Sequence, residues 1–424
     1  MSRMFRSLNA FNYRVWFAGA VVSNIGNWMQ STALSWVVLT ALSDNDAGAM
    51  GIALGLRFAP SLLFVALTGW VVDRFDRRRL LMLTQSLLGA MSIAIGVLLL
   101  ADVMTLVAMY AFAFAAGIVT AIDNPARQTF VTDVVGPELA SNAVALNSAS
   151  FNSARMIGPA VSGLLIVAVG SGWVFLIDSL TFLAMLAALI VIRTDELQPR
   201  ARPRQRSRLA DGFRYARTRP DILVIFVVVF LMGALAMNFP IYASTMAIEF
   251  GREADGFGLL SSVIAIGSLA GALLSARRAR ARMRVVVAAT GAFAVIAAAS
   301  TLMPGYWSYA AMLIGVGFAT VTMLTTANGY VQTTTPTEVR GRVMAIYMAI
   351  LLGGTPLGAP IVGQVANLWG PRAAILLGAA GALVACATAL IWMTTSGRLH
   401  RNPERRFALT LDDTRAIRLP GTEE

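Results

Sequence analysis

Three charged residues stand inside long apolar stretches of this sequence, where a charge is costly and usually functional. Arg57 and Asp178 lie some residues inside the ends of their apolar blocks, and Arg155 lies near the middle of its block. A cation beside a buried carboxylate favours the ionised form of that carboxylate. A pair of Asp178 with Arg155 or Arg57 could therefore be a permanent structural brace. Alternatively, Asp178 gains a proton when the arginine moves away.

Other residues that carry chemistry are scarce. The chain has no Lys, which Walker A loops, retinal linkages and pyridoxal linkages all need. The single Cys386 cannot form an intrachain disulfide, and the single His400 lies in a polar tail, so a His-rich metal site is excluded. We expect no cofactor, no metal site and no enzymatic activity. A proton relay would have to use carboxylates, and Asp123 is the second candidate, although its position favours a gate contact.

The composition indicates which elements hold these residues. Of the 424 residues, 57% are hydrophobic and 13% are charged, whereas soluble globular chains have roughly 45–50% apolar and about 25% charged residues. The apolar residues form blocks long enough to span a bilayer as helices. We expect an all-α membrane protein with twelve transmembrane helices, at about 14–42, 50–72, 80–101, 104–122, 143–168, 173–192, 221–247, 257–276, 285–303, 306–328, 343–367 and 373–395.

The positive charge follows the expected helices. All 34 basic residues are Arg, the formal net charge is +12, and most of the arginines fall in loops on one side of the apolar blocks. This bias orients membrane proteins, so we expect a plasma-membrane protein with both termini cytoplasmic and no nucleic-acid partner. Between the halves, Leu209, Phe213 and Tyr215 at helical spacing predict an amphipathic helix. Its arginines indicate a generally lipid-attracted face in preference to specific binding of anionic lipid.

The sequences of the two halves of the chain resemble each other at an offset of 200 residues. Matching positions include Gly117 and Gly317, Gly158 and Gly358, Gly163 and Gly363, and Gly170 and Gly370. We expect two pseudo-symmetric six-helix bundles, an arrangement known for transporters with a site between the repeats. The expected domains are an N-terminal bundle at 1–195, a cytoplasmic linker with the amphipathic helix at 196–220, a C-terminal bundle at 221–397 and a cytoplasmic tail at 398–424.

The loop between the second and third expected helices resembles the G-x-x-x-D-R-x-x-R-[KR] loop of the major facilitator superfamily. Its motif residues are Gly69, Asp73, Arg74, Arg77 and Arg78. Gly69 would let neighbouring backbones approach, and Asp73 at a helix end could pair with arginines or a facing helix N-terminus. We expect a charge lock that favours one of two states of the halves; the alternative is a positive-inside loop only. The second half has Ser275 in place of the carboxylate, so the lock should be asymmetric.

A second motif lies in the fifth expected helix and is similar to the G-P-x-x-x-G motif of drug and metabolite exporters. It comprises Gly158, Pro159 and Gly163, with Arg155 one turn before them. Small residues allow close packing and proline bends a helix, so the segment can act as a stiff, water-tight hinge. The usual upstream glycine is replaced by Asn152 or Ser153. Ordinary packing of glycine and proline in a membrane helix is the alternative.

Together with these motifs, three further stretches, at 23–30, 123–127 and 175–179, are similar to the transmembrane secretion effector branch, which includes siderophore exporters and macrolide efflux proteins. In the fold that this resemblance implies, helices one, four, seven and ten line the pathway. The cavity candidates on that basis are Asn24, Asn27, Trp28, Gln30, Asn238 and Asn328. Amides can also simply hold helices together. No acidic residue is expected inside the spans of the second half, so coupling would belong to the first.

The leading hypothesis is a proton-coupled exporter of a small amphipathic molecule, such as a drug, a siderophore or another secondary metabolite, working by alternating access as a monomer in the lipid bilayer. An importer or facilitator would share the fold, because fold does not set direction. A non-transporting membrane receptor or scaffold would need large extra-membrane domains. The longest non-membrane segments expected here are the linker and the tail.

Overall fold

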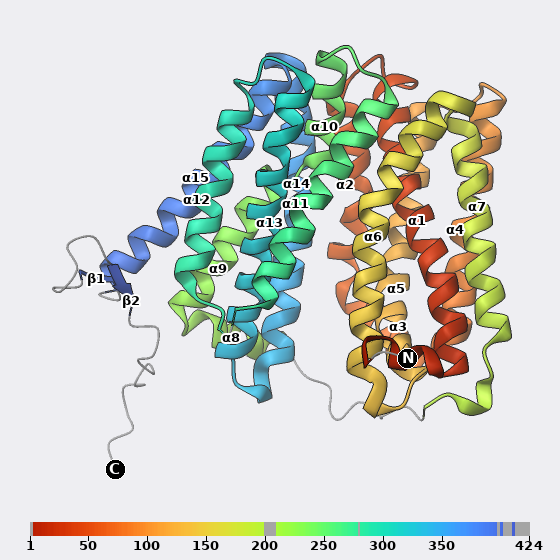
Figure 1. Cartoon of the computed structure of the whole chain (residues 1–424), viewed down its shortest axis with the longest axis horizontal. Helices are drawn as coiled ribbons and strands as arrows, with labels where there is room; N and C mark the ends of the chain where they lie inside the picture. The colour runs from red at the N-terminus through yellow and green to blue at the C-terminus, as the bar shows by residue number, and fades with distance from the viewer. Residues whose placement is uncertain (1–2, 199–208, 279, 397–398, 402–408, 412–424) are drawn as a thin grey trace.

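The computed structural model describes residues 3–198, 209–278, 280–396, 399–401 and 409–411. Its helices form two bundles that lie side by side, in contact at the top of Figure 1 and separated at the bottom. The middle of the expected linker and most of the expected tail lie outside the described residues. The expected all-α membrane architecture is confirmed, with two short tail strands added.

The N-terminal bundle contains seven α-helices and two short 3-10 helices. They are η1 (Arg3–Asn9), α1 (Phe11–Thr40), α2 (Ala47–Leu63), α3 (Val65–Arg74), α4 (Arg77–Leu100), α5 (Leu106–Asp133), α6 (Pro137–Val169), α7 (Ser171–Val191) and η2 (Thr194–Glu196). Side chains cap three of these helices at their N-termini: Asp46 caps α2, Asp76 caps α4 and Thr105 caps α5. These caps satisfy free backbone N–H groups, which explains where the helices begin.

The C-terminal bundle begins with a short helix that packs on the lower end of the bundle (Figure 1). Its elements are α8 (Leu209–Arg217), α9 (Pro220–Leu231), the π-helical η3 (Met232–Ala236), α10 (Phe239–Glu249), α11 (Ala254–Ala276), α12 (Met283–Ser300), α13 (Tyr306–Thr334), α14 (Thr337–Trp369) and α15 (Pro371–Thr395). Beyond them, β1 (Leu399–Arg401) and β2 (Leu409–Leu411) pair antiparallel. The helix α8 falls where the sequence predicts an amphipathic helix, and Asp211 on it forms an ion pair with Arg342 of α14.

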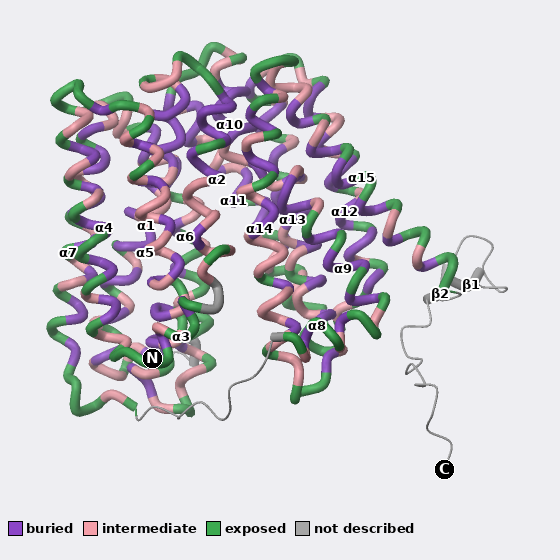
Figure 2. Tube along the Cα trace, turned by 180° about the vertical axis from the view of Figure 1, so that it is seen from behind, coloured by how far each residue is buried: buried purple, intermediate pink, exposed green. Residues whose placement is uncertain are grey.

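Ten of the described helical segments are long and apolar enough to cross a membrane, or eleven if the bent pair α2 and α3 counts as one span. The helix α1 is not in this set, although it has 30 residues. Its amide and hydroxyl side chains make it more polar, and it lies between α6 and α7 inside the N-terminal bundle (Figure 2). With α1 added, the described chain reaches the twelve spans that the sequence predicts.

Two helices differ from their expected course. The fourth helix continues past Pro125 to Asp133, so Asp123 lies inside it and not at its end. Proline disfavours a helical residue before it, which is why the sequence pattern predicts an end at 122. The seventh helix is broken into α9, η3 and α10. At the break Asn238 Nδ2 donates to the Ala234 carbonyl at 2.7 Å, which satisfies a backbone oxygen that the break leaves free.

Two helix pairs join the halves on the side opposite α8 and the N-terminus (Figure 1). In the first pair, a Cβ added at Gly51 of α2 would overlap the Ala359 carbonyl of α14, and one at Gly363 would overlap the Ala47 carbonyl. Backbones therefore touch directly, as small residues permit in membranes. We call the contacts of the two pairs the outer seam.

The second pair of the outer seam repeats this geometry in α6 and α11. A Cβ at Gly258 would overlap the Pro159 carbonyl, and one at Gly163 would overlap the Ala254 carbonyl. Each helix places its two contact residues four positions apart, as in the first pair. The internal repeat seen in the sequence thus becomes a pseudo-symmetric closure, with matching glycines and carbonyls.

The first pair of the seam also carries a polar contact across the halves. Asn367 Oδ1 of α14 accepts a hydrogen bond from the Ala47 N–H at 2.7 Å, and its Nδ2 donates to Asp46. Burial acts to raise the pKa of Asp46, but hydrogen bonds from Asn367 and from the backbone N–H groups of Ala49 and Gly48 outweigh it and lower the pKa below 3.8. The ionised form of Asp46 therefore stabilises this contact.

Candidate functional site

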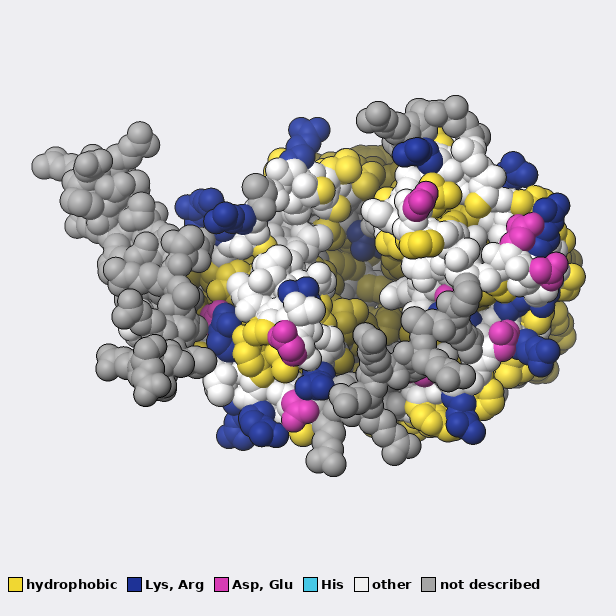
Figure 3. Space-filling view, turned by 90° about the horizontal axis from the view of Figure 1, so that it is seen from below, with side chains coloured by type: hydrophobic (Ala, Val, Ile, Leu, Met, Phe, Trp, Pro, Cys, Tyr) yellow, Lys and Arg dark blue, Asp and Glu magenta, His cyan; other side chains and the backbone are white. Residues whose placement is uncertain are grey.

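A cavity of about 340 Å³ lies between the two halves and is lined by residues from both. The N-terminal half contributes α1, α2 and α6, and the C-terminal half contributes η3, α10, α11, α13 and α14. Seen from below, the surface is hollowed between the halves and largely apolar there (Figure 3). The volume falls within the range of about 300–1,000 Å³ that is usual for small-molecule sites.

Two polar residues in this cavity have atoms without partners. Arg155 Nε and Asn238 Oδ1 are buried, and neither forms a hydrogen bond in the described part of the chain. Buried polar atoms in proteins are normally paired. These two atoms are therefore unpaired polar groups in the wall of the cavity. No carboxylate is among the described lining residues, so the charge of Arg155 is not balanced there.

Of the six predicted cavity residues, the structure places Trp28 and Asn238 in the cavity wall. The other four are not among the described lining residues: Asn24, Asn27, Gln30 and Asn328. Asn24 donates to a serine of α6 at 3.2 Å, and Asn328 accepts from a glutamine one turn along α13 at 2.6 Å. For Asn24, the alternative of amides that hold helices together describes the contact better, whereas the hydrogen bond of Asn328 stays within α13.

The sequence analysis missed three hydroxyl residues that line the cavity beside Trp28, namely Ser31, Thr32 and Ser35. They share one face of α1 with Trp28, since residues three, four and seven positions apart lie together on a helix. Their helical spacing from Trp28 was the signal that would have found them. Serine and threonine bond back to their own helix in α1, for example Ser35 to the Ser31 carbonyl at 3.0 Å, so their types alone were uninformative.

Asp178 lies in the core of the N-terminal bundle and is fully buried. Its Oδ2 is 2.9 Å from Ser92 Oγ, and its Oδ1 is 3.2 Å from Thr181 Oγ1. Gln30 Nε2 donates to Ser92 Oγ at 3.2 Å, which extends the network to α1. At Gly26 the helix α1 comes so close to Asp178 that an added Cβ would clash with the carboxylate.

The helix α1 separates this network from the cavity. Gly26 and Gln30 are one turn apart and face Asp178, whereas Trp28 and Ser35 lie on the opposite face and line the cavity. A proton that travels between Asp178 and the cavity therefore has to pass α1. Gln30 on the inner face is the polar side chain of α1 that reaches the network.

The two arginines considered as partners of Asp178 differ in position. In the part of the chain that the structure describes, neither Arg57 nor Arg155 forms an ion pair with Asp178. Arg57 interacts with Asp178 electrostatically without contact, whereas Arg155 lies in the cavity wall. Neither arginine therefore braces Asp178 by direct contact in this conformation. Of the two, Arg57 is the one whose charge interacts with Asp178.

Asp123 is also buried, but its environment is the opposite of that of Asp178. It forms an ion pair with Arg127 on the next turn of α5, at 3.3 Å, and accepts hydrogen bonds from Thr84 at 2.6 Å and Gln85 at 2.8 Å. Arg127 also donates to Ser23 at 3.2 Å. The sequence analysis missed Arg127, because the helix was expected to end before it. Asp123 is therefore held by an ion pair and by two hydrogen bonds from α4.

Two arginines of the motif, Arg77 and Arg78, anchor its loop, whereas Asp73 does not. Asp73 is exposed and has no ion pair among the described residues, and no atom lies within 4 Å of a Cβ placed at Gly69. Arg77 instead forms a bidentate pair with Asp133 at 2.8 and 2.9 Å. Arg78 donates to the Leu189 carbonyl at 2.6 Å. The close approach expected at Gly69 is therefore absent in this conformation, while the loop itself is firmly held.

The second half does contain a buried carboxylate, which corrects the expectation that it has none within its spans. Asp221 in the first turn of α9 is 1% exposed. It pairs with Arg219 through bonds of 3.0 and 2.7 Å and accepts from Tyr330 at 3.0 Å. The hydrogen bonds to Asp221 raise the pKa of Arg219. The position at a helix end concealed this residue, since charges there are common in any membrane helix.

The residues of the second motif divide between two interfaces. Gly158 faces α1, where an added Cβ would clash with Trp28, and Ser162 donates to the Met29 carbonyl at 2.8 Å. Pro159 and Gly163 face α11 in the outer seam. The motif therefore links the cavity wall of α1 to the contact between the halves. Ordinary helix packing accounts for Gly158, whereas Gly163 belongs to the closure.

Three relatives of known name resemble the chain over much of its length. The staphyloferrin A transporter of Staphylococcus aureus is 26% identical over 62% of this chain and 66% of that protein. The enterobactin exporter of Citrobacter koseri is 25% identical over 82% of this chain and 84% of that one. The multidrug efflux pump Tap of Mycolicibacterium fortuitum is 25% identical over 84% of this chain and 90% of the pump.

A solved structure shows the same fold. A bacterial homologue of the human lysosomal transporter Spinster, in an inward-facing and unoccupied conformation, matches with a TM-score of 0.72 at 15% identity, over 91% of this chain and 97% of that one. The profile of the transmembrane secretion effector family matches residues 4–408. The protein is therefore a multi-pass membrane transporter of the major facilitator superfamily and belongs to its transmembrane secretion effector family.

Proposed function

We propose that this transporter exports a small amphipathic molecule in exchange for protons by alternating access. The named relatives that support export are an enterobactin exporter and a multidrug efflux pump. The cavity between the halves supports alternating access, because it is lined by both bundles and lies beside a seam of direct backbone contacts. Rocking of the halves would open the seam and close the opposite face.

The cavity lining favours a cargo with a large apolar part and a hydrogen-bond acceptor or acid. Its wall contains aromatic and aliphatic side chains such as Trp28, Phe58 and Phe257, with Arg155 as the unbalanced charge. An acidic or acceptor group would pair with Arg155, while the apolar body contacts the aromatic wall. Drugs, siderophores and other secondary metabolites include molecules of this kind.

The observation that carries proton coupling is the state of Asp178. It is the buried carboxylate, among those described, that has hydroxyl partners but no contacting cation. Asp123 and Asp221 are each paired with an arginine. A carboxylate held by hydroxyl groups can exchange a proton without breaking an ion pair, and burial penalises its charged form.

The test uses proteoliposomes that contain the purified protein and a verified cargo. Uptake or release is measured with and without an imposed pH gradient for the wild type and for Asp178→Asn. We expect the variant to lose gradient-driven accumulation and to keep cargo exchange in the absence of a gradient. Asp221→Asn is the matched control, because it neutralises a buried carboxylate in the other half. It should keep gradient dependence in whatever fraction remains folded.

Full gradient dependence in folded Asp178→Asn would exclude Asp178 as the coupling carboxylate. Loss of both exchange and accumulation, together with a lower melting temperature, would instead assign Asp178 a structural role. The double variant with Arg155→Gln separates cargo contact from coupling. Compared with Asp178→Asn alone, the double variant should bind the cargo more weakly. Its gradient dependence should be the same as that of the single variant.

The direction of transport depends on orientation, for which we propose that both termini and the linker are cytoplasmic. The arginine-rich loops lie on the face that carries α8 and the N-terminus (Figure 3). A cysteine introduced at Arg204 should resist membrane-impermeant reagents in intact cells. Labelling of this cysteine from outside would show that the orientation is the reverse of the proposed one. The open face of the cavity would then be external.

A further inference from the structure

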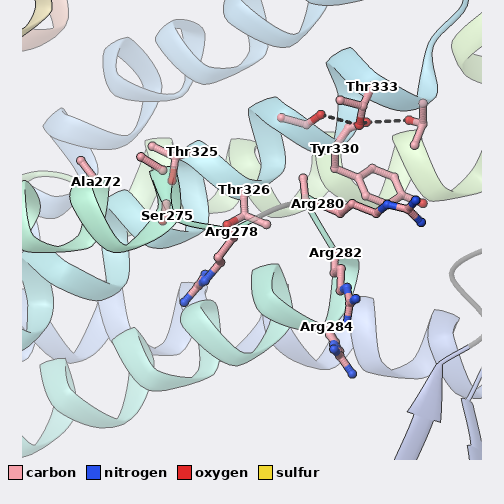
Figure 4. Close-up of a pocket in the computed structure, with 14 residues that line it drawn as sticks. Ala272, Ser275, Arg278, Arg280, Arg282, Arg284, Thr325, Thr326, Tyr330 and Thr333 are labelled. Atoms are coloured by element: carbon pink, nitrogen blue, oxygen red, sulfur yellow. Dashed lines mark hydrogen bonds between the residues drawn. The ribbon is translucent and has the colours of Figure 1, made fainter.

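A second pocket, of about 780 Å³, lies in the C-terminal half, where the loop between α11 and α12 meets α13. It is separate from the cavity between the halves and lies at the α8-bearing ends of these helices (Figure 1). Figure 4 shows arginines along the loop and hydroxyl side chains from the helices around the pocket. The arginines that line it are Arg278, Arg280, Arg282 and Arg284.

The positive charge of this pocket is not balanced by nearby acids. Among the described residues, none of the four arginines forms an ion pair. Tyr330 in the wall contacts Asp221, but that carboxylate is already paired with Arg219. An unbalanced group of four cations in a concave site attracts anions strongly.

Two further groups at the same place offer hydrogen-bond donors. Ser275 Oγ lines the pocket, is buried and has no hydrogen-bond partner among the described residues. The helix α12 begins beside Arg282, and no side chain caps its first turn. Free N–H groups at a helix N-terminus bind anions, and arginines add planar donors that fit phosphate oxygens. The donor set therefore fits a phosphate group.

The equivalent loop of the first half uses its arginines differently. There Arg77 pairs with Asp133, and Arg78 binds backbone carbonyls at the end of α7. Those contacts hold the loop in place. In the second loop, the four described arginines of the pocket form no such pairs, so their charge is available for a ligand.

We propose that the pocket binds the phosphate group of an anionic phospholipid headgroup from the membrane leaflet on this side. A phosphate could also come from solution, but the surroundings favour a lipid. Beside the pocket residues of α11, Leu273 and Leu274 turn outward and are 60% and 43% exposed. They offer apolar surface for acyl chains directly next to the charged site. Basic pockets between membrane helices bind lipid headgroups in this way.

The test titrates the full-length detergent-purified protein with phosphatidylglycerol, and measures bound lipid by native mass spectrometry and the melting temperature. The wild type should show a saturable site. The double variant Arg280→Gln with Arg282→Gln should bind roughly thirtyfold more weakly, since each arginine near anionic lipid contributes about fivefold. Arg280→Lys with Arg282→Lys keeps the charge and should retain affinity within about fivefold.

Controls separate this site from general attraction. Arg79→Gln removes one exposed cation from the equivalent loop of the first half and should leave the site unchanged. Phosphatidylcholine should not saturate it. Equal phosphatidylglycerol affinity of wild type and the double glutamine variant would refute the site. Inorganic phosphate that saturates it at the same concentration, with the same arginine dependence, would refute a lipid as the ligand.

Discussion

In the N-terminal bundle, Asp178 and the pair of Asp123 with Arg127 lie deep among the helices. In the C-terminal bundle, the buried carboxylate among the described residues is Asp221, at the first turn of α9 and paired with Arg219. Yet the two bundles contribute matching glycines to the outer seam. Closure thus uses both copies of the repeat equally, whereas buried charge is concentrated in one. The shape of the seam is constrained equally in both halves, whereas the proposed proton coupling uses a single site in one half.

The symmetry of the seam can be broken from either side. We expect Gly51→Ala and Gly258→Ala to reduce transport to a similar extent, by about tenfold or more, because each added Cβ would overlap a backbone carbonyl. The halves would then fail to close at the seam. The measurement is cargo flux, with labelling of a cysteine at Ser35 by a membrane-impermeant maleimide from outside in a Cys386→Ser background.

A matched control for this pair is Gly291→Ala on the peripheral helix α12. Its Cβ would meet only the sulfur of Cys386, at 3.2 Å, so it should transport normally with the native cysteine present. If one seam variant abolished transport and the other left it intact, the two pairs would not be equivalent in closure.

The difference in buried charge predicts a difference in stability. Asp221→Asn leaves Arg219 without its bidentate partner, and removal of one member of a buried pair costs about 3–5 kcal/mol. Asp178→Asn keeps the size of the side chain and breaks no ion pair, so a cost of about 1 kcal/mol is expected. Thermal unfolding of the purified variants checks this order. Equal melting temperatures would mean that Asp178 is as firmly paired as Asp221.

The motif loops of the two halves offer a subtler comparison. Asp73→Asn should slow transport by several-fold, on the order of 1 kcal/mol in the barrier, because the charge is available to pair when the α8-bearing face closes. Its melting temperature should not change, since Asp73 forms no ion pair with any described residue in this conformation. Ser275→Ala in the second loop should leave the rate unchanged. A folded Asp73→Asn protein that transports at the original rate would remove the gate role.

The smallest expected effect concerns the polar contact found in only the first pair of the seam. Since the pKa of Asp46 is lowered on folding, its stabilisation is complete above the ordinary value of 3.8 and is lost as the pH falls through the lowered value. Asp46→Ala should cost about 1 kcal/mol at neutral pH, as expected for a helix cap. The cost should shrink in acid. Melting curves of both proteins between pH 3 and pH 7 provide the test, and a pH-independent difference would contradict it.

Much of the fold could be predicted because hydropathy and arginine placement report directly on membrane spans. The two bundles and the repeat followed from patterns that persist over hundreds of residues. The end of α5 and the break near Asn238 did not, because a proline or an amide inside a membrane helix is compatible with either continuation or interruption. That choice depends on neighbouring helices.

The candidate site was harder to predict, because residue type does not say which face of a helix meets which neighbour. Trp28 and Gln30 are two positions apart, yet one lines the cavity and the other contacts Ser92. Likewise Arg57 and Arg155 could not be ranked as partners of Asp178 without coordinates. Local spacing resolves such cases only when the orientation of the helix is known.

The outer seam has a consequence for how this protein can change over evolutionary time. At Gly51 and Gly363 the opposing atom is a backbone carbonyl oxygen, which no substitution of the partner residue can shorten. A larger residue at either glycine therefore has no compensating mutation across the interface and would require displacement of a whole helix. We therefore expect these glycines to tolerate no stepwise substitution. The cavity wall is built from side chains that can be exchanged, so it can change to accept a new cargo.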